Sequence, residues 1–155
     1  MTEWSDECPE LDCSALGIVV RVQLLAKLFH DSAERSLRGV GLKLWEYDVL
    51  SALRRQGAPY EMIASELADA SLLTSGTITT RIDRLEQRGL VERWPSPDDR
   101  RTVIVRLTAA GRQLVDQAVG PRLESADEEL GGLSVTELDQ LSSGLRKILS
   151  RAAPV

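Results

Sequence analysis

The feature that most constrains this chain is an amphipathic segment followed directly by a basic β-hairpin. Within residues 75–88, Ile78, Ile82 and Leu85 recur at helical spacing and form one apolar stripe. The hydroxyl and guanidinium side chains of this segment fall on its other faces. A helix that packs on one side and presents such groups on the other suits a DNA groove. The hairpin that follows carries arginines at its tip, so the two elements together indicate DNA binding.

The distribution of charge supports this interpretation better than the total does. The chain has 155 residues, is 43% apolar and 28% charged, and carries a net charge of −5. Residues 71–107 hold seven arginines against five carboxylates, a local charge of +2, which leaves −7 for the rest. Phosphate binding depends on the field within about 8–10 Å, so the local sign matters more than the total. A merely solvated charged face is the alternative.

The first residues indicate neither export nor membrane insertion. The chain starts with an acidic stretch that lacks the basic region of a signal peptide, and its apolar run at 15–20 is far too short to span a membrane. We therefore expect a cytoplasmic protein that makes no membrane contact. Cys8 and Cys13 are expected to be unpaired reduced thiols in a flexible leader, with a redox switch as the alternative.

Periodicity and capping signals predict the order of the elements. Helices are predicted over residues 14–38, 43–55, 59–68, 75–88 and 109–130, strands over 90–94 and 102–107, and a last helix after a capping box at 134–137. Thr108 is the predicted N-cap of the fifth helix, and Gly120–Pro121 should kink that helix or split it in two.

These elements predict a mainly α fold with a small β-hairpin wing. A winged helix-turn-helix DNA-binding lobe, residues 42–107, is flanked by a leader at 1–13, an N-terminal dimerisation helix at 14–41 and C-terminal dimerisation helices at 108–155. The flanking helices have little sheet to cover, so their apolar stripes are expected to pack on each other and on a second copy. The predicted interface residues are Ile18, Val22, Leu138, Leu141, Leu145 and Ile148.

Four segments together resemble one protein family. They are residues 75–93 (SGTITTRIDRLEQRGLVER), 97–101 (PDDRR), 105–111 (VRLTAAG) and 45–57 (WEYDVLSALRRQG). This pattern closely resembles the MarR family of bacterial transcriptional regulators, over most of the chain from about residue 20 onward. The resemblance implies a homodimer of triangular outline whose interface is built from both chain ends. It also implies that helix 75–88 enters the major groove while the wing tip reaches the neighbouring minor groove.

The resemblance also implies roles for individual residues. Thr74, Ser75, Thr77 and Arg81 match family positions that face bases and phosphates. Asp99 and Arg101 match the family's Asp-x-Arg wing motif, in which the arginine enters the minor groove and the aspartate orients it. Beside them, Arg100 is a candidate for phosphate contact. The full candidate DNA-binding set is Thr74, Ser75, Thr77, Thr80, Arg81 and Arg84 on the helix, with Asp99, Arg100 and Arg101 on the wing.

Physical arguments support these roles independently. A helix N-terminus with free N–H groups and hydroxyls is a ready phosphate site, and Ser75 and Thr77 lie there. A bidentate arginine–guanine pair gives roughly 1–3 kcal/mol of discrimination between bases. For Arg84, pairing with Asp83 or Glu92 is an equally good interpretation. A dimer would place its two recognition helices roughly 34 Å apart and so read a pseudo-palindrome.

Residues that would support catalysis or metal binding are scarce. His30 is the only histidine, so a histidine-based triad or a multi-histidine metal site cannot be built. The sequence contains no zinc-peptidase, Cys-x-x-Cys or phosphate-loop motif. We therefore expect no enzymatic activity, no cofactor and no metal.

A sensing pocket is a further expectation from the resemblance, because the family binds small, often phenolic anions between its dimer helices and its DNA-binding lobe. Arg21 and His30 on the first helix, with Trp45 and Asp48 on the second, lie where those parts should meet. Trp45 would line the pocket, and Arg21 or His30 would meet the anion. The alternative is that Trp45 is only a core residue and His30 only a surface residue.

The sequence therefore predicts a homodimeric transcription factor, most simply a repressor. It would bind a pseudo-palindromic operator in double-stranded DNA and be released by a small anionic or phenolic effector. A helical protein–protein interaction module, docking a partner protein through the winged helix, is the alternative. Steep loss of affinity with salt, about 0.9 log units per phosphate contact per log unit of salt, would distinguish DNA binding.

Overall fold

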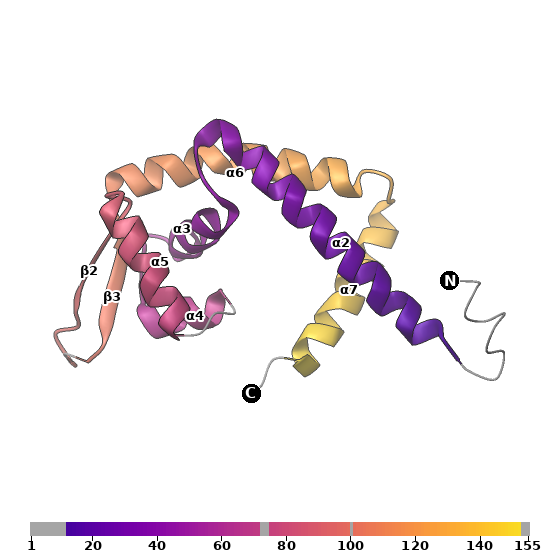
Figure 1. The fold of residues 1–155 in the computed structure, drawn as a ribbon, viewed down its shortest axis with the longest axis horizontal. Coiled ribbons are helices and arrows are strands. Elements are labelled where there is room, and N and C mark those ends of the chain that lie inside the picture. The colour runs from indigo at the N-terminus through magenta and orange to yellow at the C-terminus, as the bar shows by residue number, and fades with distance from the viewer. Residues whose placement is uncertain (1–11, 72–74, 100, 153–155) are drawn as a thin grey trace.

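The computed structural model describes residues 12–71, 75–99 and 101–152. The molecule is an arch (Figure 1): helix α6 (Ala109–Leu130) runs along its top, with the wing at one end and α7 (Val135–Ala152) descending from the other. Helix α2 (Ser14–Leu37) crosses α6 and packs against it. The predicted fold class, mainly helical with a small sheet and a wing, is confirmed.

Residues 42–107 form a winged lobe that supplies most of the core, around α3 (Leu44–Arg55), α4 (Ala64–Ala70) and α5 (Ser75–Gln87). Leu37 of α2 and Val115 and Ala118 of α6 complete the same core. Helix α4 packs on α5 to form the helix-turn-helix, and α3 packs on α4, on two strands and on α6. Full burial of an aliphatic side chain is worth about 1.5–3 kcal/mol, so this cluster holds the lobe together. Its fully buried members include Leu50, Leu53, Leu67, Ile78, Ile82 and Leu85.

Three antiparallel strands form the sheet, where the sequence predicted only two. Strands β2 (Val91–Pro95) and β3 (Val103–Leu107) form the wing, and β1 (Glu61–Ile63) pairs with the other edge of β3. The predicted helix over 59–68 is therefore wrong in its first half. Tyr60 has φ of +63°, which a right-handed helix does not accommodate. Pairing of Ile63 with Ile104 completes the sheet before α4 begins.

Helix α6 is continuous from Ala109 to Leu130, so of the two effects predicted for Gly120–Pro121, a kink or a split, the split is wrong. Val115 and Ala118 before the proline and Ser125 after it are all buried, and α6 packs along both α2 and α3. This packing on both sides of Pro121 outweighs the loss of one helical hydrogen bond. The predicted N-cap is confirmed: the Gly111 N–H donates to Thr108 Oγ1 at 3.0 Å.

The capping box predicted at the start of the last helix, α7, is also confirmed. The Ser134 N–H donates to Glu137 Oε2 at 2.8 Å and the Glu137 N–H donates to Ser134 Oγ at 3.4 Å, which is a capping box.

In the first half of the chain, α2 is followed by one turn of 3₁₀ helix, η1 (Arg38–Val40), which ends at Gly41 with φ of +73°. None of the helices in the described ranges is long and apolar enough to cross a membrane.

Candidate nucleic-acid interface

Helix α5 has one buried and one open face. Ile78, Ile82 and Leu85 are at most 2% exposed and pack toward α4 and β2, whereas Thr80 and Arg84 are exposed. Thr77 is exposed as well, and the Thr80 hydroxyl donates to the Gly76 carbonyl oxygen at 3.2 Å. The helix thus presents hydroxyl and guanidinium groups to solvent, as the sequence predicted.

Part of the predicted site cannot be placed. Thr74 and Arg100 lie outside the described residues, and of Ser75 only the backbone, which begins α5, is described. Their assignment to the DNA interface stays a prediction.

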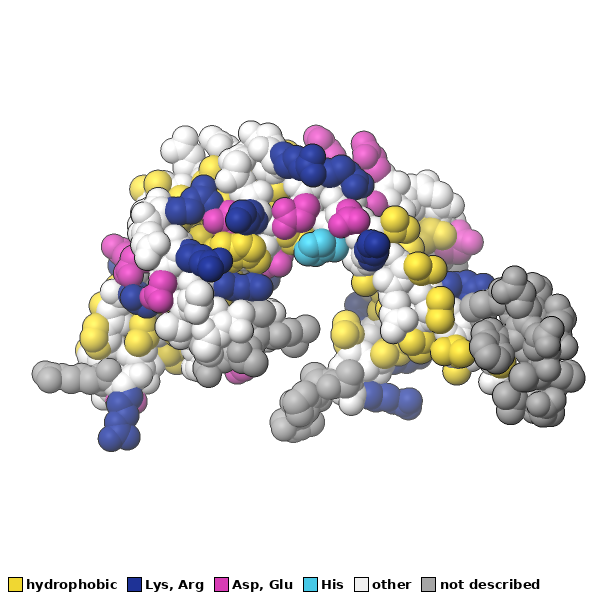
Figure 2. Space-filling model, in the orientation of Figure 1, with side chains coloured by type: hydrophobic (Ala, Val, Ile, Leu, Met, Phe, Trp, Pro, Cys, Tyr) yellow, Lys and Arg dark blue, Asp and Glu magenta, His cyan; other side chains and the backbone are white. Residues whose placement is uncertain are grey.

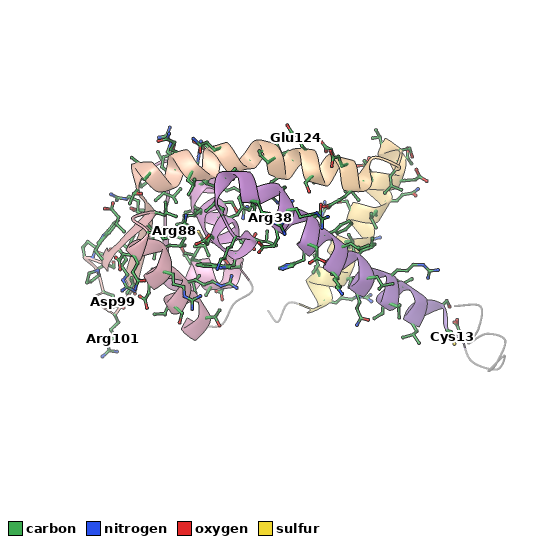
Figure 3. The ribbon with its side chains drawn as sticks, turned by 45° about the horizontal axis from the view of Figure 1, so that its top comes forward. Cys13, Arg38, Arg88, Asp99, Arg101 and Glu124 are labelled. Atoms are coloured by element: carbon green, nitrogen blue, oxygen red, sulfur yellow. The ribbon has the colours of Figure 1, made fainter. Side chains whose placement is uncertain are left out.

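The wing tip is organised by Asp99. Its carboxylate accepts hydrogen bonds from the Arg101 N–H at 3.0 Å and from the Thr102 hydroxyl at 3.1 Å, and its carbonyl accepts from the Thr102 N–H at 2.9 Å. The aspartate therefore holds the backbone of Arg101 rather than its guanidinium. Figure 3 shows the Arg101 side chain extending away from the tip of the hairpin, where it is exposed.

The arginines of α5 and the wing fall into two groups. Three of them are held by carboxylates: Arg88 by Glu46, Arg93 by Asp83 and Glu86, and Arg106 by Glu61 and Glu92. Arg84 and Arg101 are exposed and form no ion pair with any residue that the structure describes. The alternative pairing of Arg84 with Asp83 or Glu92 is thus not observed, because those acids pair with Arg93 and Arg106.

Arg81 lies differently from the other arginines of α5. It is half-buried, and its Cζ lies 5.5 Å from the centroid of the Trp45 ring, a cation–π contact. It also attracts the carboxylate of Asp48. The sequence predicted that Arg81 faces DNA; the structure places its guanidinium against α3, so a direct base contact requires the side chain to turn outward.

Asp48 is the centre of a cationic cluster. Although part of the residue is open to solvent, surrounding side chains desolvate its carboxyl and raise its pKa. The positive charges of Arg81, Arg122, Arg55 and His30 oppose that rise. One carboxylate thus lies within electrostatic reach of three guanidiniums and an imidazole, without an ion pair to any of them among the described residues. Figure 2 shows basic, acidic and histidine side chains gathered at the inner corner of the arch.

Arg122 is a member of this cluster that sequence reasoning missed. Its Nε and Nη1 atoms are buried and have no hydrogen-bond partner among the described residues. Two buried donors without hydrogen-bond partners are costly, because they have lost water and gained no hydrogen bond in exchange. No motif marks Arg122 in the sequence; only the packing of α6 against the rest of the arch brings it near Asp48.

Comparison with known proteins agrees with this geometry. A family model described as the MarR family matches residues 42–103. The HTH-type transcriptional regulator PecS of Dickeya dadantii is 31% identical over 146 residues, which are 94% of this chain and 88% of PecS. The chain belongs to the MarR family. It is therefore a transcriptional regulator with a winged helix-turn-helix, and the resemblance found in its sequence is confirmed.

Solved structures show the same fold. A mutant MarR from E. coli, complexed with operator DNA, has a TM-score of 0.78 and 24% identity, with 94% of this chain and 97% of that chain covered. CouR from Rhodococcus jostii RHA1, bound to p-coumaroyl-CoA, has a TM-score of 0.74 and 24% identity, with 84% of this chain and 90% of CouR covered.

In this MarR-family chain the predicted dimer residues leave an apolar surface open. Ile18 and Val22 on α2 are 58% and 42% exposed, and Leu141, Leu145 and Ile148 on α7 are 41%, 39% and 55% exposed. Leu138 is half-buried and lines, with its α7 neighbours and Leu130, a groove of about 540 Å³. The described residues do not cover these stripes.

The predicted pocket residues of this MarR-family chain are only partly brought together. His30, Trp45 and Asp48 belong to the cationic cluster through the contacts of Asp48 and Arg81. Arg21 lies nine residues before His30 on the same helix, about 13 Å along its axis, and its Nη1 donates to the Gly17 carbonyl at 3.0 Å. Arg21 is thus not among the cations that act on Asp48, whereas Arg122 is, and the role of Arg21 in an effector pocket stays a prediction.

Proposed function

We propose that this chain represses transcription by binding a pseudo-palindromic operator as a homodimer. The carrying observation is that the N-terminal end of α5 and the tip of the β2–β3 wing face the same side of the molecule (Figure 1). The wing tip carries Arg101, an exposed arginine that forms no ion pair with the described residues, and α5 carries a second such arginine, Arg84, in its last turn. Phosphates attract such unpaired guanidiniums, and arginine also fits guanine edges and narrow minor grooves.

The division of labour along the chain follows from this proposal. Residues 42–107 form the DNA-binding lobe, and helices within 14–41 and 108–155 serve dimerisation. Thr74, Ser75 and Thr77 meet phosphates at the start of α5, while Thr80, Arg81 and Arg84 face the major groove. The wing brings Arg101 to the minor groove with Asp99 holding its backbone, and Arg100 reaches a phosphate. The mutant MarR structure with operator DNA supports this docking for the shared fold.

A small aromatic anion is the proposed effector. The cluster around Asp48 holds more positive than negative charge, and Trp45 provides an aromatic wall next to it. Arg81 belongs both to this cluster and to α5, so an anion that engages it would restrain a side chain proposed to meet DNA. The p-coumaroyl-CoA in CouR supports ligand response in this fold.

The protein is proposed to act in the cytoplasm, without membrane contact, and without catalysing a reaction. Its family is one of transcriptional regulators and not a class of enzymes. The alternative is that the winged lobe docks a partner protein rather than DNA. No feature of the described residues favours this alternative over DNA binding through the exposed arginines.

The test begins with selection of binding duplexes from a random DNA library, using the full chain. The affinity of the selected duplex is then measured across a salt series for wild type, Arg101→Ala and Arg112→Ala. Arg112 is the control because it is an arginine that is 52% exposed on α6, outside the wing. We expect an inverted repeat, and a salt slope that Arg101→Ala reduces by about 1 while Arg112→Ala leaves it unchanged.

An absence of enriched duplexes at low salt, from folded protein, would overturn the proposed function in favour of a protein partner. Equal effects of the two substitutions would remove the wing from the interface while leaving DNA binding in place.

A further inference from the structure

The end of the recognition helix α5 is joined to the rest of the molecule through one buried carboxylate. Glu46, at the start of α3, is 5% exposed and is the one charged residue in the described ranges that is buried. Its Oε1 accepts a hydrogen bond from Arg88 Nη1 at 2.6 Å, and its Oε2 accepts one from the Lys43 N–H at 2.9 Å. Arg88 follows directly after α5 and is still hydrogen-bonded into its last turn.

The same arginine reaches the segment that joins α2 to α3, which we call the junction (residues 38–44). Arg88 Nη2 donates to the carbonyl oxygen of Gly41 at 3.3 Å, the residue at which η1 ends. On the opposite side of the junction, the Leu44 N–H donates to Glu34 Oε1 on α2 at 3.0 Å. Figure 3 shows Arg88 at the upper end of α5. A continuous path of bonds thus runs from α2 through the junction to α5.

The free-energy cost of burying Glu46 indicates that its contact with Arg88 fixes the orientation of α5 more than it stabilises the fold. Burying a carboxylate loses its hydration, and an ion pair recovers that loss only when its bonds are well made. Both oxygens of Glu46 are used, and the guanidinium binds a carboxylate and a carbonyl at once. Because arginine has a planar fork with fixed donor directions, this contact sets an orientation as well as a distance.

We infer that Glu46 and Arg88 are positioning residues, which hold α5 at a set place relative to α2 and thereby determine the half-site spacing that the dimer accepts. The inference rests on the proposed dimeric DNA binding. In a dimer whose interface includes α2, the distance between the two recognition helices depends on how firmly each α5 is held to its own α2. Neither residue needs to touch DNA for this effect, since both act through the placement of the helix.

Arg93 supplies a matched control within the same lobe. It is an arginine on β2 that pairs with Asp83 at 2.5 Å and with Glu86 at 3.1 Å, both on α5. Its side chain is 35% exposed, against 40% for that of Arg88. Replacing either arginine by alanine removes one positive charge and one set of ion pairs from α5. Only the replacement of Arg88 disconnects α5 from the junction.

The experiment measures affinity for the selected operator and for two duplexes in which its half-sites are moved together or apart by one base pair. Full-length wild type, Arg88→Ala, Glu46→Gln, Arg88→Lys and Arg93→Ala are compared, each shown by circular dichroism and sedimentation to be folded and dimeric. The readout is the ratio of affinities for the selected and the shifted duplexes, because a general loss of stability or charge lowers all affinities together and leaves this ratio unchanged.

We expect Arg88→Ala and Glu46→Gln to lower this ratio at least threefold, and Arg88→Lys, which keeps one donor toward Glu46, to restore part of it. Arg93→Ala should weaken binding to all three duplexes while keeping the wild-type ratio. If Arg88→Ala does not fold, the affinity ratio of Glu46→Gln tests the inference instead. The glutamine amide oxygen can still accept a hydrogen bond from the Lys43 N–H, so this variant keeps one of the native contacts. An unchanged ratio in the folded variants, or a wild type without spacing preference, would overturn the inference. A wild type that selects no duplex would instead overturn the proposed function.

Discussion

The winged lobe and the two flanking helices α2 and α7 carry the same kind of apolar stripe, but the stripes differ in how far they are buried. In the lobe, apolar stripes at helical spacing meet one another, and side chains such as Leu50 and Leu53 are fully buried. In α2 and α7 equally regular stripes remain open, with Leu28 and Leu149 each 61% exposed. Among the described residues, one set of apolar stripes is therefore buried in a core and the other is left exposed.

This difference separates folding from assembly. The energy of the lobe's core is available to a single chain, whereas that of α2 and α7 is gained only when a further apolar surface covers them. Substitutions in the lobe should therefore change the free energy of unfolding, and substitutions on the open stripes should change the association equilibrium. Four predictions test this contrast, from the largest expected effect to the smallest.

Leu145→Asp should abolish assembly. A carboxylate within an apolar interface costs several kcal/mol, and a symmetric dimer contains it twice. We expect the dissociation constant measured by sedimentation to rise by more than about a hundredfold, with retained helical content. Gln140→Asp, which adds the same charge to α7 outside the stripe, is the control. An unchanged dimer would show that α7 does not form the interface.

Leu53→Ala should act on folding instead. Leu53 is 0% exposed in the core of the lobe, and its truncation leaves a cavity. The free energy of unfolding should fall by about 2–5 kcal/mol in chemical denaturation. Leu123→Ala, at a residue that is 60% exposed, should stay within about 0.5 kcal/mol of wild type. Equal losses for the two variants would contradict the proposed division between closed and open surfaces.

Gly111→Ala tests where the lobe meets α6. A Cβ at Gly111 would lie 1.9 Å from the backbone oxygen of Leu90, so the first turn of α6 must move away from the wing. Overpacking of this kind costs about 1–3 kcal/mol. In Gly120→Ala nothing lies within 4 Å of the new methyl group, and the helix should gain up to about 1 kcal/mol. Thermal unfolding of both variants measures the difference in stability between them. A Gly111→Ala variant as stable as wild type would contradict the predicted close contact between α6 and the wing.

The smallest effect is expected at Asp48, between the two regions. Removing its charge in Asp48→Asn should tighten the binding of an aromatic sulfonate, followed by tryptophan fluorescence, by about threefold to tenfold. In wild type the affinity should rise as the pH falls, because protonation of Asp48, whose pKa is raised, has the same effect. The sulfonate stays ionised throughout. A variant that binds no tighter than wild type would remove Asp48 from the effector site.

Local patterns predicted most of the fold. The helix of residues 75–87, the wing strands, the Thr108 cap and the capping box at Ser134 all depend on contacts within a few residues, and each is observed. The wrong predictions occur where contacts between segments far apart in the sequence determine the secondary structure. Strand β1 exists because the edge of β3 needs a partner, and α6 continues through Pro121 because α2 and α3 hold it on both sides of the proline.

The candidate site divides in the same way. The open hydroxyls of α5 and the exposed Arg101 follow from periodicity and a motif, which the sequence alone displays. The pairing of Arg93 and Arg106 with acids, which leaves Arg84 exposed, depends on three-dimensional neighbours.

By itself, the sequence determined the family, the order of the elements and the residues that present guanidiniums toward a ligand. Only the tertiary structure decided that Arg81 turns against Trp45, that two guanidinium nitrogens of Arg122 are buried and its charge acts on Asp48, and that Arg88 binds Glu46. The physical reason is range. Helical periodicity and capping act over a few residues, whereas an ion pair between residues 46 and 88 exists only after the chain has folded back on itself.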